Sequence, residues 1–407
     1  MLTAIGKNGE PISLADSWSK NELVELERKS GFYCPVCKQN LQLKLGTKKQ
    51  WHFAHKHTKS CSFESEAESE YHRKGKMQLY RWLTAQGYQP TLEPYLPSIQ
   101  QRPDLLFSYQ GRQIALEYQC SPIHESIHKK RTSSFRKKNI LPFWIVGGNR
   151  IKRKGTYEYT IHSFEWLCTF SKLPSFLFPM LTYYCSSSEN FYSALNLLPI
   201  SSQKALSSIL IKPLQKYSFT DILRPVIDNE REDRLFRYWV TVKKNWRYST
   251  FPFQSSIQKF FQVLCYHHSM YPSLFPIEAG WPTPYSYFIE TPMHIWQTWT
   301  LLKMFSLPQD QPILFRFLQT AFSDAIDKNL FHIRDLQSEG YVYSLYAYLD
   351  FLSSIHVLEK INNATYIIKT PYRIPLSVSD AIELDEAFFH RQFYPYIQSQ
   401  NIKIEKK

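Results

Sequence analysis

The chain has 407 residues, of which 43% are hydrophobic and 16% aromatic. This length favours two or three domains, and the apolar content excludes a chain dominated by disorder. The formal net charge of +14 favours a polyanionic partner, with nucleic acid as the default candidate.

The sequence predicts the cellular location through two segments that it lacks, a signal peptide and a membrane span. The opening residues MLTAIGKNGEPISLADSWSK lack a basic stretch followed by an apolar core, so no signal peptide is predicted. Apolar runs such as LPSFLFPMLTYYC are interrupted by proline and are too short to span a bilayer. We therefore expect a cytoplasmic protein in which the seven cysteines are unpaired.

Residues 1–62 are predicted to form a small N-terminal domain. A short strand pair around LTAIGKNGEPISL precedes a polar helix, WSKNELVELERKSG. The following stretch, FYCPVCKQNLQLKLGTKKQWHFAHK, is typical of a knuckle, a strand, a Gly-centred hairpin and a second strand.

This first segment carries candidate metal ligands. Cys34 and Cys37 have the spacing of a knuckle that aims two sulfurs at one ion, and His52 and His55 add two imidazoles. A structural Zn²⁺ in a Cys2His2 site is the prediction. The two histidines are closer together than is usual, so we expect a strand end or a turn to carry them. His57 or Cys61 remains an alternative fourth ligand.

Residues 63–155 are predicted to form a second domain with the order helix, three strands, helix, strand. The helix FESEAESEYHRKGKMQLYRWLTAQG ends at Gly87, and the candidate strands are YQPTLEPYL, RPDLLFSY and RQIALEYQC. A helix, IHESIHKKRTSSFRKKN, and a buried strand, LPFWIVGG, complete the domain. If the second and third strands form a hairpin, the carboxylates of Asp104 and Glu117 converge at one end of the sheet.

Carboxylates arranged in this way are the ligands that Mg²⁺ prefers, and the bound ion can polarise a scissile phosphate. The first helix adds Glu68, His72 and Lys76 at a spacing of four residues, which places them on one helical face. Glu70 lies off this face, and the choice between Glu68 and Glu70 as the acidic contributor stays open.

A basic segment at residues 129–138 predicts a surface that follows the phosphate backbone of DNA. The absence of a base-reading motif favours single-stranded or branched DNA over a sequence-specific duplex. The basic residues are Lys129, Lys130, Arg131, Arg136, Lys137 and Lys138.

Residues 156–407 are predicted to be a largely α-helical domain that binds DNA or partner proteins. The period of apolar residues indicates helices in REDRLFRYWVTVKKNW, SSIQKFFQVLCYHH, TPMHIWQTWTLLKMF and QPILFRFLQTAFSDAI. A helix followed by a hairpin is predicted within residues 341–372, as in a helix-plus-wing unit.

Several ordered motifs resemble a known family. The element order with RPD followed by ALEYQ resembles the PD-(D/E)xK nuclease core. Together with CPVC…HFAH, SEYHRKGK and EYQCSPI…KRTSSF…PFWIVGG, roughly residues 1–150 resemble the competence protein CoiA family of transformable bacteria. The expected fold is a mixed α+β and α/β chain. It has a zinc-ribbon-like N-terminal unit, a restriction-endonuclease-like αβββαβ core and a largely α-helical C-terminal domain.

The resemblance implies that Asp104 and Glu117 bind a catalytic Mg²⁺ or Mn²⁺ ion. Gln119 stands where the wider nuclease class usually has lysine, and glutamine forms hydrogen bonds but carries no charge. The remaining catalytic candidates are then Glu68, Glu70 and His72. The residues that could supply the missing positive charge are Lys74 and Lys76 of the first helix and Arg131 of the second.

The resemblance also implies a metal-dependent deoxyribonuclease that acts on incoming DNA during competence-linked recombination, with recombination proteins as partners. An alternative is a non-catalytic DNA-binding recombination mediator with a nuclease-like fold, which the neutral Gln119 favours. A third reading is an RNA-processing or phage-defence nuclease.

Overall fold

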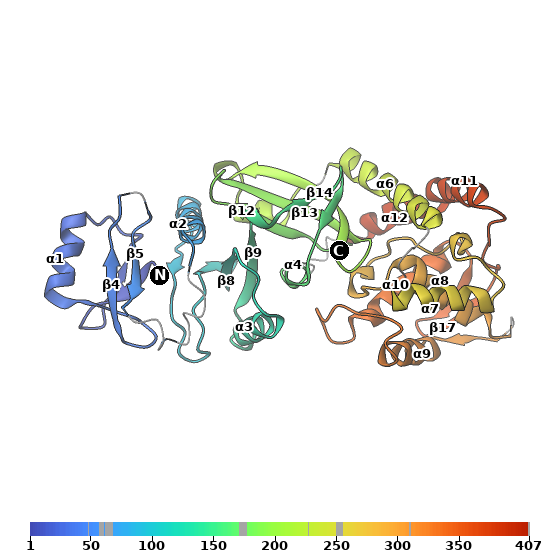
Figure 1. Cartoon of the computed structure of the whole chain (residues 1–407), viewed down its shortest axis with the longest axis horizontal. Helices are drawn as coiled ribbons and strands as arrows, with labels where there is room; N and C mark the ends of the chain where they lie inside the picture. The colour runs from blue at the N-terminus through green and yellow to red at the C-terminus, as the bar shows by residue number, and fades with distance from the viewer. Residues whose placement is uncertain are drawn as a thin grey trace.

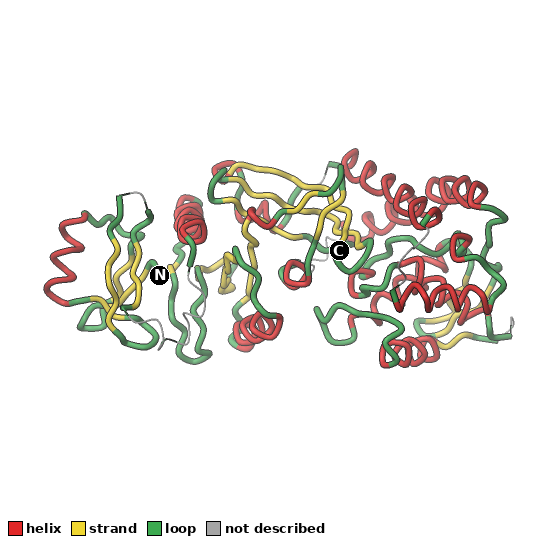
Figure 2. The backbone as a smooth tube through the Cα atoms, viewed as in Figure 1, coloured by secondary structure: helices red, strands yellow, loops and turns green. Residues whose placement is uncertain are grey.

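The structure is a computed structural model that describes residues 1–47, 49–56, 61, 68–170, 177–226, 228–249, 255–308 and 311–405. The molecule is elongated, and the chain runs from a small sheet at one end, through a large central sheet, to a helical region at the other (Figures 1 and 2). Within the described ranges, no helix has the length and apolar character needed to cross a membrane.

The N-terminal unit is a five-stranded antiparallel sheet with one helix, α1 (Lys20–Ser30). The helix begins at a capping box formed by Ser19 and Glu22, which satisfies backbone donors that the first turn leaves unpaired. Phe32 and Phe53 lie in the core of the unit. The strand order is β2 (Pro11–Ser13), β1 (Thr3–Ile5), β3 (Phe32–Tyr33), β4 (Asn40–Lys44) and β5 (His52–His55).

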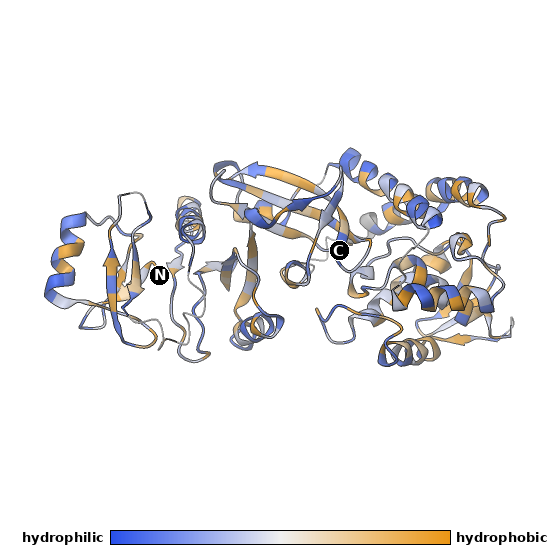
Figure 3. Ribbon diagram, in the orientation of Figure 1, coloured by the Kyte–Doolittle hydropathy of each residue, from blue (hydrophilic) through white to orange (hydrophobic). Residues whose placement is uncertain are grey.

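The central sheet has nine strands, and only β9 is parallel to its two neighbours. Its strands are hydrophobic along much of their length, whereas α1 and α3 (Glu125–Lys137) are more hydrophilic (Figure 3). The strands in spatial order are β10 (Lys152–Arg153), β11 (Glu158–Thr160), β14 (Lys204–Pro213), β13 (Asn190–Pro199), β12 (Leu181–Cys185), β9 (Leu141–Gly147), β8 (Arg112–Gln119), β7 (Leu105–Tyr109) and β6 (Thr91–Leu92).

Helices α2 (Glu70–Ala85) and α3 cover opposite faces of this sheet. Leu79 of α2 packs with Leu116 of β8, whereas Trp144 of β9 lies on the other face and contacts His128 of α3. From α2 to β9 the chain follows the predicted order of helix, three strands, helix and strand. The hairpin of β7 and β8 is also present, with Leu105 paired with Leu116.

The prediction of a largely helical chain beyond residue 155 is wrong for β11, β12, β13 and β14, which extend the central sheet to Pro213. The boundary expected at residue 155 therefore falls inside one continuous sheet. The reason is that β13 is buried almost continuously rather than on alternate residues. A strand that is buried on both faces lacks the alternation by which a sequence distinguishes a strand from a helix. Helices α4 (Ser163–Leu167) and α5 (Phe219–Leu223) accompany this extension.

The C-terminal region is mainly helical around an aromatic core that includes Trp239, Trp281 and Trp296. The helix and hairpin expected within residues 341–372 are present as α10 followed by β16 and β17. The elements are α6 (Asn229–Tyr248), α7 (Ser256–His267), α8 (Met293–Phe305), β15 (Ile313–Leu314), α9 (Phe315–Asp327), α10 (Gly340–Ser354), β16 (Leu358–Asn362), β17 (Thr365–Ile368), α11 (Val378–Phe388) and α12 (Tyr394–Glu405).

Candidate functional site

Four potential metal ligands converge in the N-terminal unit. The sulfurs of Cys34, Cys37 and Cys61 and a ring nitrogen of His55 all lie within 4.8 Å of one another. Cys34 and Cys37 come from the turn between β3 and β4, and His55 ends β5. The Cys37 sulfur lies 3.2 Å from His55 Nε2. Three sulfurs and one imidazole match the ligand types of a structural zinc site.

His52 is not part of this cluster, so the predicted Cys2His2 set is corrected to Cys3His. His52 Nδ1 lies 3.0 Å from the Gln50 carbonyl oxygen. Successive side chains of a strand point to opposite faces, and residues three apart in β5 therefore diverge. Cys61, which the sequence left as an alternative, takes the fourth position. His57, the other alternative, lies outside the described residues.

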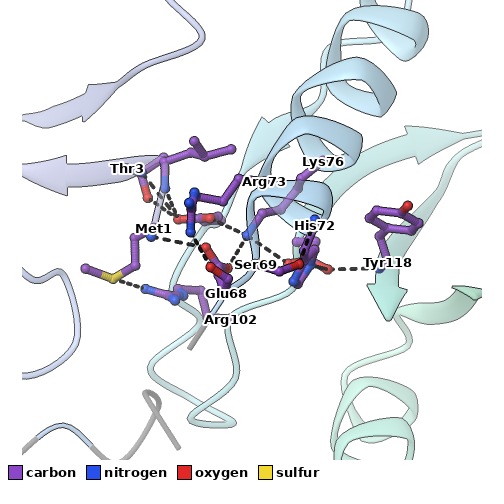
Figure 4. Close-up of polar contacts among 12 residues, drawn as sticks. Met1, Thr3, Glu68, Ser69, His72, Arg73, Lys76, Arg102 and Tyr118 are labelled. Atoms are coloured by element: carbon purple, nitrogen blue, oxygen red, sulfur yellow. Dashed lines mark hydrogen bonds and ion pairs between the residues drawn. The ribbon is translucent and has the colours of Figure 1, made fainter. Parts of the chain in front are cut away.

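A second cluster is centred on Lys76 of α2, whose side chain is 1% exposed. Its Nζ lies 2.5 Å from Glu68 Oε1, 2.5 Å from Glu93 Oε1 and 3.2 Å from Asp104 Oδ1. Figure 4 shows the lysine reaching from the helix into this group. Burial opposes the charge, but the three carboxylates hold the pKa of Lys76 above its ordinary value. The lysine is thus a fixed cation.

Asp104, directly before β7, receives several polar contacts. His72 Nε2 lies 3.4 Å from Asp104 Oδ2, which also accepts a 2.8 Å hydrogen bond from the Tyr118 backbone N–H. Burial opposes ionisation, but Lys76 and His72 hold the pKa of Asp104 below its usual range. Donor atoms of Glu68, His72 and Asp104 all lie within 4.8 Å of one another. Two carboxylates and an imidazole can hold a divalent cation.

The structure also distinguishes the two candidate glutamates of the first helix. Glu68 directly precedes the N-cap residue Ser69, and its carboxylate joins the cluster. The amino group of Met1 lies 3.1 Å from its other oxygen. Glu70, the first residue of α2, is exposed. Glu68 is therefore the glutamate that belongs to this cluster.

Glu93 is a member of the cluster that the sequence analysis missed. It follows β6 with a φ of 48° and is 3% exposed. Besides Lys76, its carboxylate accepts hydrogen bonds from the backbone N–H groups of Leu2 at 2.9 Å and Thr3 at 3.3 Å. An acid directly before proline is typical of a turn, so Glu93 did not stand out in the sequence. The one feature that could have indicated its burial was its place between apolar residues.

Glu117 lies beside this cluster on the adjacent strand. Since Leu105 pairs with Leu116, Asp104 stands opposite Glu117. Glu117 is 1% exposed, and Arg131 Nη2 of α3 lies 2.7 Å from both of its oxygens. Burial raises the pKa of Glu117 to about 7, although Arg131 acts in the opposite direction. Glu117 is therefore held in an ion pair with Arg131, on the strand next to Asp104.

Gln119 is buried near Glu117, and its amide donates a 2.9 Å hydrogen bond to the Ser121 carbonyl oxygen. Of the three residues that could supply the missing positive charge, Lys76 and Arg131 contact the carboxylates. Lys74 is exposed on α2.

The basic segment forms much of α3, as predicted. Lys130, Arg136, Lys137 and Lys138 are exposed. Lys129 is half-buried and contacts Glu125 at 2.6 Å as well as Asp335 of the C-terminal region. Four of the six candidate cations thus face solvent, and Arg131 points to Glu117.

Three family models match the chain, and they define its class as a protein with a central nuclease-like domain. The competence protein CoiA N-terminal domain matches residues 15–64, the nuclease-like domain 68–226 and the C-terminal domain 236–382. Competence protein CoiA of Bacillus subtilis (strain 168) is 30% identical over 361 residues, which cover 88% of this chain and 95% of that protein. The chain belongs to the competence protein CoiA family. No solved structure matches it significantly.

Proposed function

We propose that this protein is a metal-dependent deoxyribonuclease that processes DNA during competence-linked recombination in the cytoplasm. The observation that carries the proposal is the convergence of Glu68, His72 and Asp104, with Glu117 on the adjacent strand, inside the nuclease-like domain. We also infer that the segment from α2 to β9 is a PD-(D/E)xK core, because its element order and the positions of Asp104 and Glu117 beside two paired strands match that pattern.

Glu68, His72 and Asp104 would hold Mg²⁺ or Mn²⁺, with Glu117 as a further oxygen ligand. When bound, such an ion polarises the phosphate and activates water. Lys76 keeps the buried carboxylates ionised, because its charge offsets their mutual repulsion. Lys76 and Arg131 would together supply the positive charge that a lysine supplies in the wider nuclease class and that Gln119 lacks.

The other two units would serve the same reaction. Cys34, Cys37, His55 and Cys61 would hold a structural Zn²⁺ that orders the N-terminal unit. The exposed cations of α3 would contact phosphates without regard to base sequence, and single-stranded or branched DNA is the proposed substrate. The C-terminal region would bind DNA or recombination proteins.

The deciding experiment incubates purified protein with labelled single-stranded, duplex and branched DNA, with Mg²⁺, Mn²⁺ or a chelator. We expect metal-dependent cleavage that Asp104→Asn and Glu117→Gln abolish. Glu70→Gln is the matched control because Glu70 is exposed outside the cluster. Cleavage that persists in both Asp104→Asn and Glu117→Gln would overturn the proposal, as would the absence of cleavage on every substrate.

One observation favours a second candidate, a DNA-binding recombination mediator that does not cut. Glu117 is paired with Arg131 and its neighbour Gln119 is uncharged, so the strand lacks a free acid and a lysine. Tight DNA binding that is unchanged in Glu117→Gln, without cleavage, would support this candidate. Competition by RNA in the same binding assay tests an RNA substrate.

A further inference from the structure

A cavity of about 530 Å³ lies on the α3 side of the central sheet, where this domain meets the C-terminal region. Its walls include Trp144 of β9, Trp166 of α4, Phe170 and Phe288, and residues 335–338 close one side. This volume is in the range of pockets that enclose a small organic ligand. Aromatic and polar side chains share the walls, which suits a flat ring with polar groups on its edge.

Two deeply buried polar side chains line this cavity without a partner among the described residues. His128 is 4% exposed, and neither of its ring nitrogens has a hydrogen bond. Trp166 is 1% exposed, and its Nε1–H is also unpaired. Burial lowers the pKa of His128 to about 4, so its neutral ring offers one donor and one acceptor. Neighbouring atoms cover these nitrogens, so a ligand with donors and acceptors on its edge would satisfy them once the two side chains turn toward the cavity.

The cavity is close to the candidate catalytic carboxylates. Trp144 pairs with Glu117 in the parallel register of β8 and β9. Arg131 contacts Glu117, and its guanidinium group lies 5.5 Å from the centroid of the Trp144 ring. A DNA strand with one phosphate near Glu117 therefore brings a neighbouring nucleotide within reach of the cavity.

The rim of the cavity is basic on its α3 side. Arg136 lines it and is exposed, whereas Lys129 lines it and contacts Asp335. Ser133, also exposed, lies between them on α3. A cation at the mouth and aromatic walls inside suit a ligand with an anionic end and a flat ring.

We propose that this cavity binds the base of an unpaired deoxynucleotide next to the phosphate at the candidate catalytic site. A nucleobase is a flat heteroaromatic ring with donors and acceptors on its edge, and its phosphate supplies the anion for Arg136. In a duplex that edge is already paired, so the site selects single-stranded DNA. This inference rests on the proposed function and specifies its substrate.

The test is equilibrium binding of fluorescein-labelled 20-nucleotide oligo-dT and oligo-dA, and of a duplex of equal length, with no Mg²⁺ or Mn²⁺ added, so that no cutting occurs and the Cys3His cluster keeps its metal. His128→Phe retains a buried ring but removes both nitrogens, and Ser133→Trp fills the rim. Each should weaken single-strand binding about tenfold and leave duplex binding unchanged. Thr241→Trp, an exposed position on α6, is the matched control.

An oligonucleotide of abasic residues separates base from phosphate recognition. We expect wild-type protein to bind it about tenfold more weakly than oligo-dT, with no further loss in His128→Phe. Equal affinity of wild type for abasic and normal strands would overturn the inference, as would unchanged single-strand binding in both variants. If wild type binds no DNA of any kind, the proposed function fails as well.

Discussion

At the scale of single residues, the two cations near Gln119 differ in how accessible they are. Lys76 is 1% exposed among three carboxylates, so it is a permanent part of the fold. The side chain of Arg131 is 24% exposed and reaches Glu117 from a helix rich in other cations. A guanidinium group binds phosphate as well as carboxylate, so we expect DNA phosphate to compete with Glu117 for Arg131.

The Cys3His cluster makes a prediction about zinc content. We expect one zinc per chain by elemental analysis, with loss of the metal in His55→Ala and Cys61→Ser, because each removes a donor atom. His52→Ala should retain it, since His52 contacts Gln50 instead. Zinc loss in His52→Ala with retention in Cys61→Ser would refute the assignment.

The sequence predicted those site residues that belong to short spaced motifs. His72 and Lys76 follow helical spacing, and Asp104 and Glu117 flank a hairpin, so local rules bring them together. Glu93 could not be predicted, because its place depends on a left-handed backbone and on contacts with Leu2 and Thr3 far away in sequence.

At the scale of elements, the distance between α2 and β8 depends on Gly75. This residue faces the ring of Tyr118, and a methyl group at Gly75 would collide with the ring carbons. Tyr118 is fully buried, and its hydroxyl donates a 3.0 Å hydrogen bond to the Tyr184 carbonyl oxygen. The ring therefore has little room to move. The close approach brings His72 and Lys76 to Asp104.

We expect Gly75→Ala to destabilise the protein by about 1–3 kcal/mol through overpacking, despite the higher helix propensity of alanine. Cleavage should also fall, because α2 moves away with His72 and Lys76. Thermal unfolding and the DNA assay measure the two effects. Gly155→Ala is the control, since the nearest atom would be at an ordinary 3.5 Å. Equal stability of Gly75→Ala and wild type would contradict this packing argument.

Helices α6 and α11 are joined by a buried charge cluster. Lys243 Nζ lies 2.8 Å from Asp385 Oδ1, and Arg247 Nε lies 2.6 Å from Asp385 Oδ2. Burial lowers the pKa of Lys243 to about 7, and the attraction of Asp385 is partly cancelled by Arg247. The Asp385 carboxylate therefore contacts both Lys243 and Arg247.

The lowered pKa of Lys243 predicts a pH dependence of stability. The unfolded lysine binds its proton up to pH 10.5 and the folded one only up to about 7. The resulting penalty is complete below pH 7 and disappears as the pH rises toward 10.5. Relative to Lys243→Met, wild type should gain up to a few kcal/mol of unfolding free energy between pH 7 and 10. Denaturant titrations measure this difference.

Lys244→Met is the control for this titration, because Lys244 is exposed on the same helix. Its stability should follow that of wild type at every pH. A constant difference between wild type and Lys243→Met across this range would show that Lys243 keeps its ordinary pKa.

At the scale of the whole molecule, the central sheet extends well beyond the segment that carries the motifs. Local patterns predicted the elements from α2 to β9, but β12 joins β9 through pairing that only the folded chain defines. Tyr184 of β12 also donates a 2.9 Å hydrogen bond to the Gln78 side chain of α2. A boundary drawn from sequence periodicity cannot account for such long-range pairing.

This organisation predicts which shortened chains fold. A chain ending at residue 226 retains the nine-stranded sheet and should unfold cooperatively, at lower stability than the full chain because Leu198 and Leu206 lose the core that they share with C-terminal helices. A chain ending at residue 155 exposes an edge of β9 and should aggregate. Circular dichroism and size-exclusion chromatography distinguish the two. A folded, monomeric 1–155 fragment would disprove the continuity of the domain.

Glu93 couples metal binding in the N-terminal unit to metal binding in the acidic cluster of the central domain. Its carboxylate binds Lys76 of the central domain and the backbone N–H groups of Leu2 and Thr3 in the N-terminal unit. A metal that stabilises the N-terminal sheet thus also holds one wall of the acidic cluster in place. The coupling free energy between two binding sites is reciprocal. If the metal of the Cys3His cluster raises the affinity of the acidic cluster for its ion, that ion raises the affinity of the Cys3His cluster for its metal by the same factor.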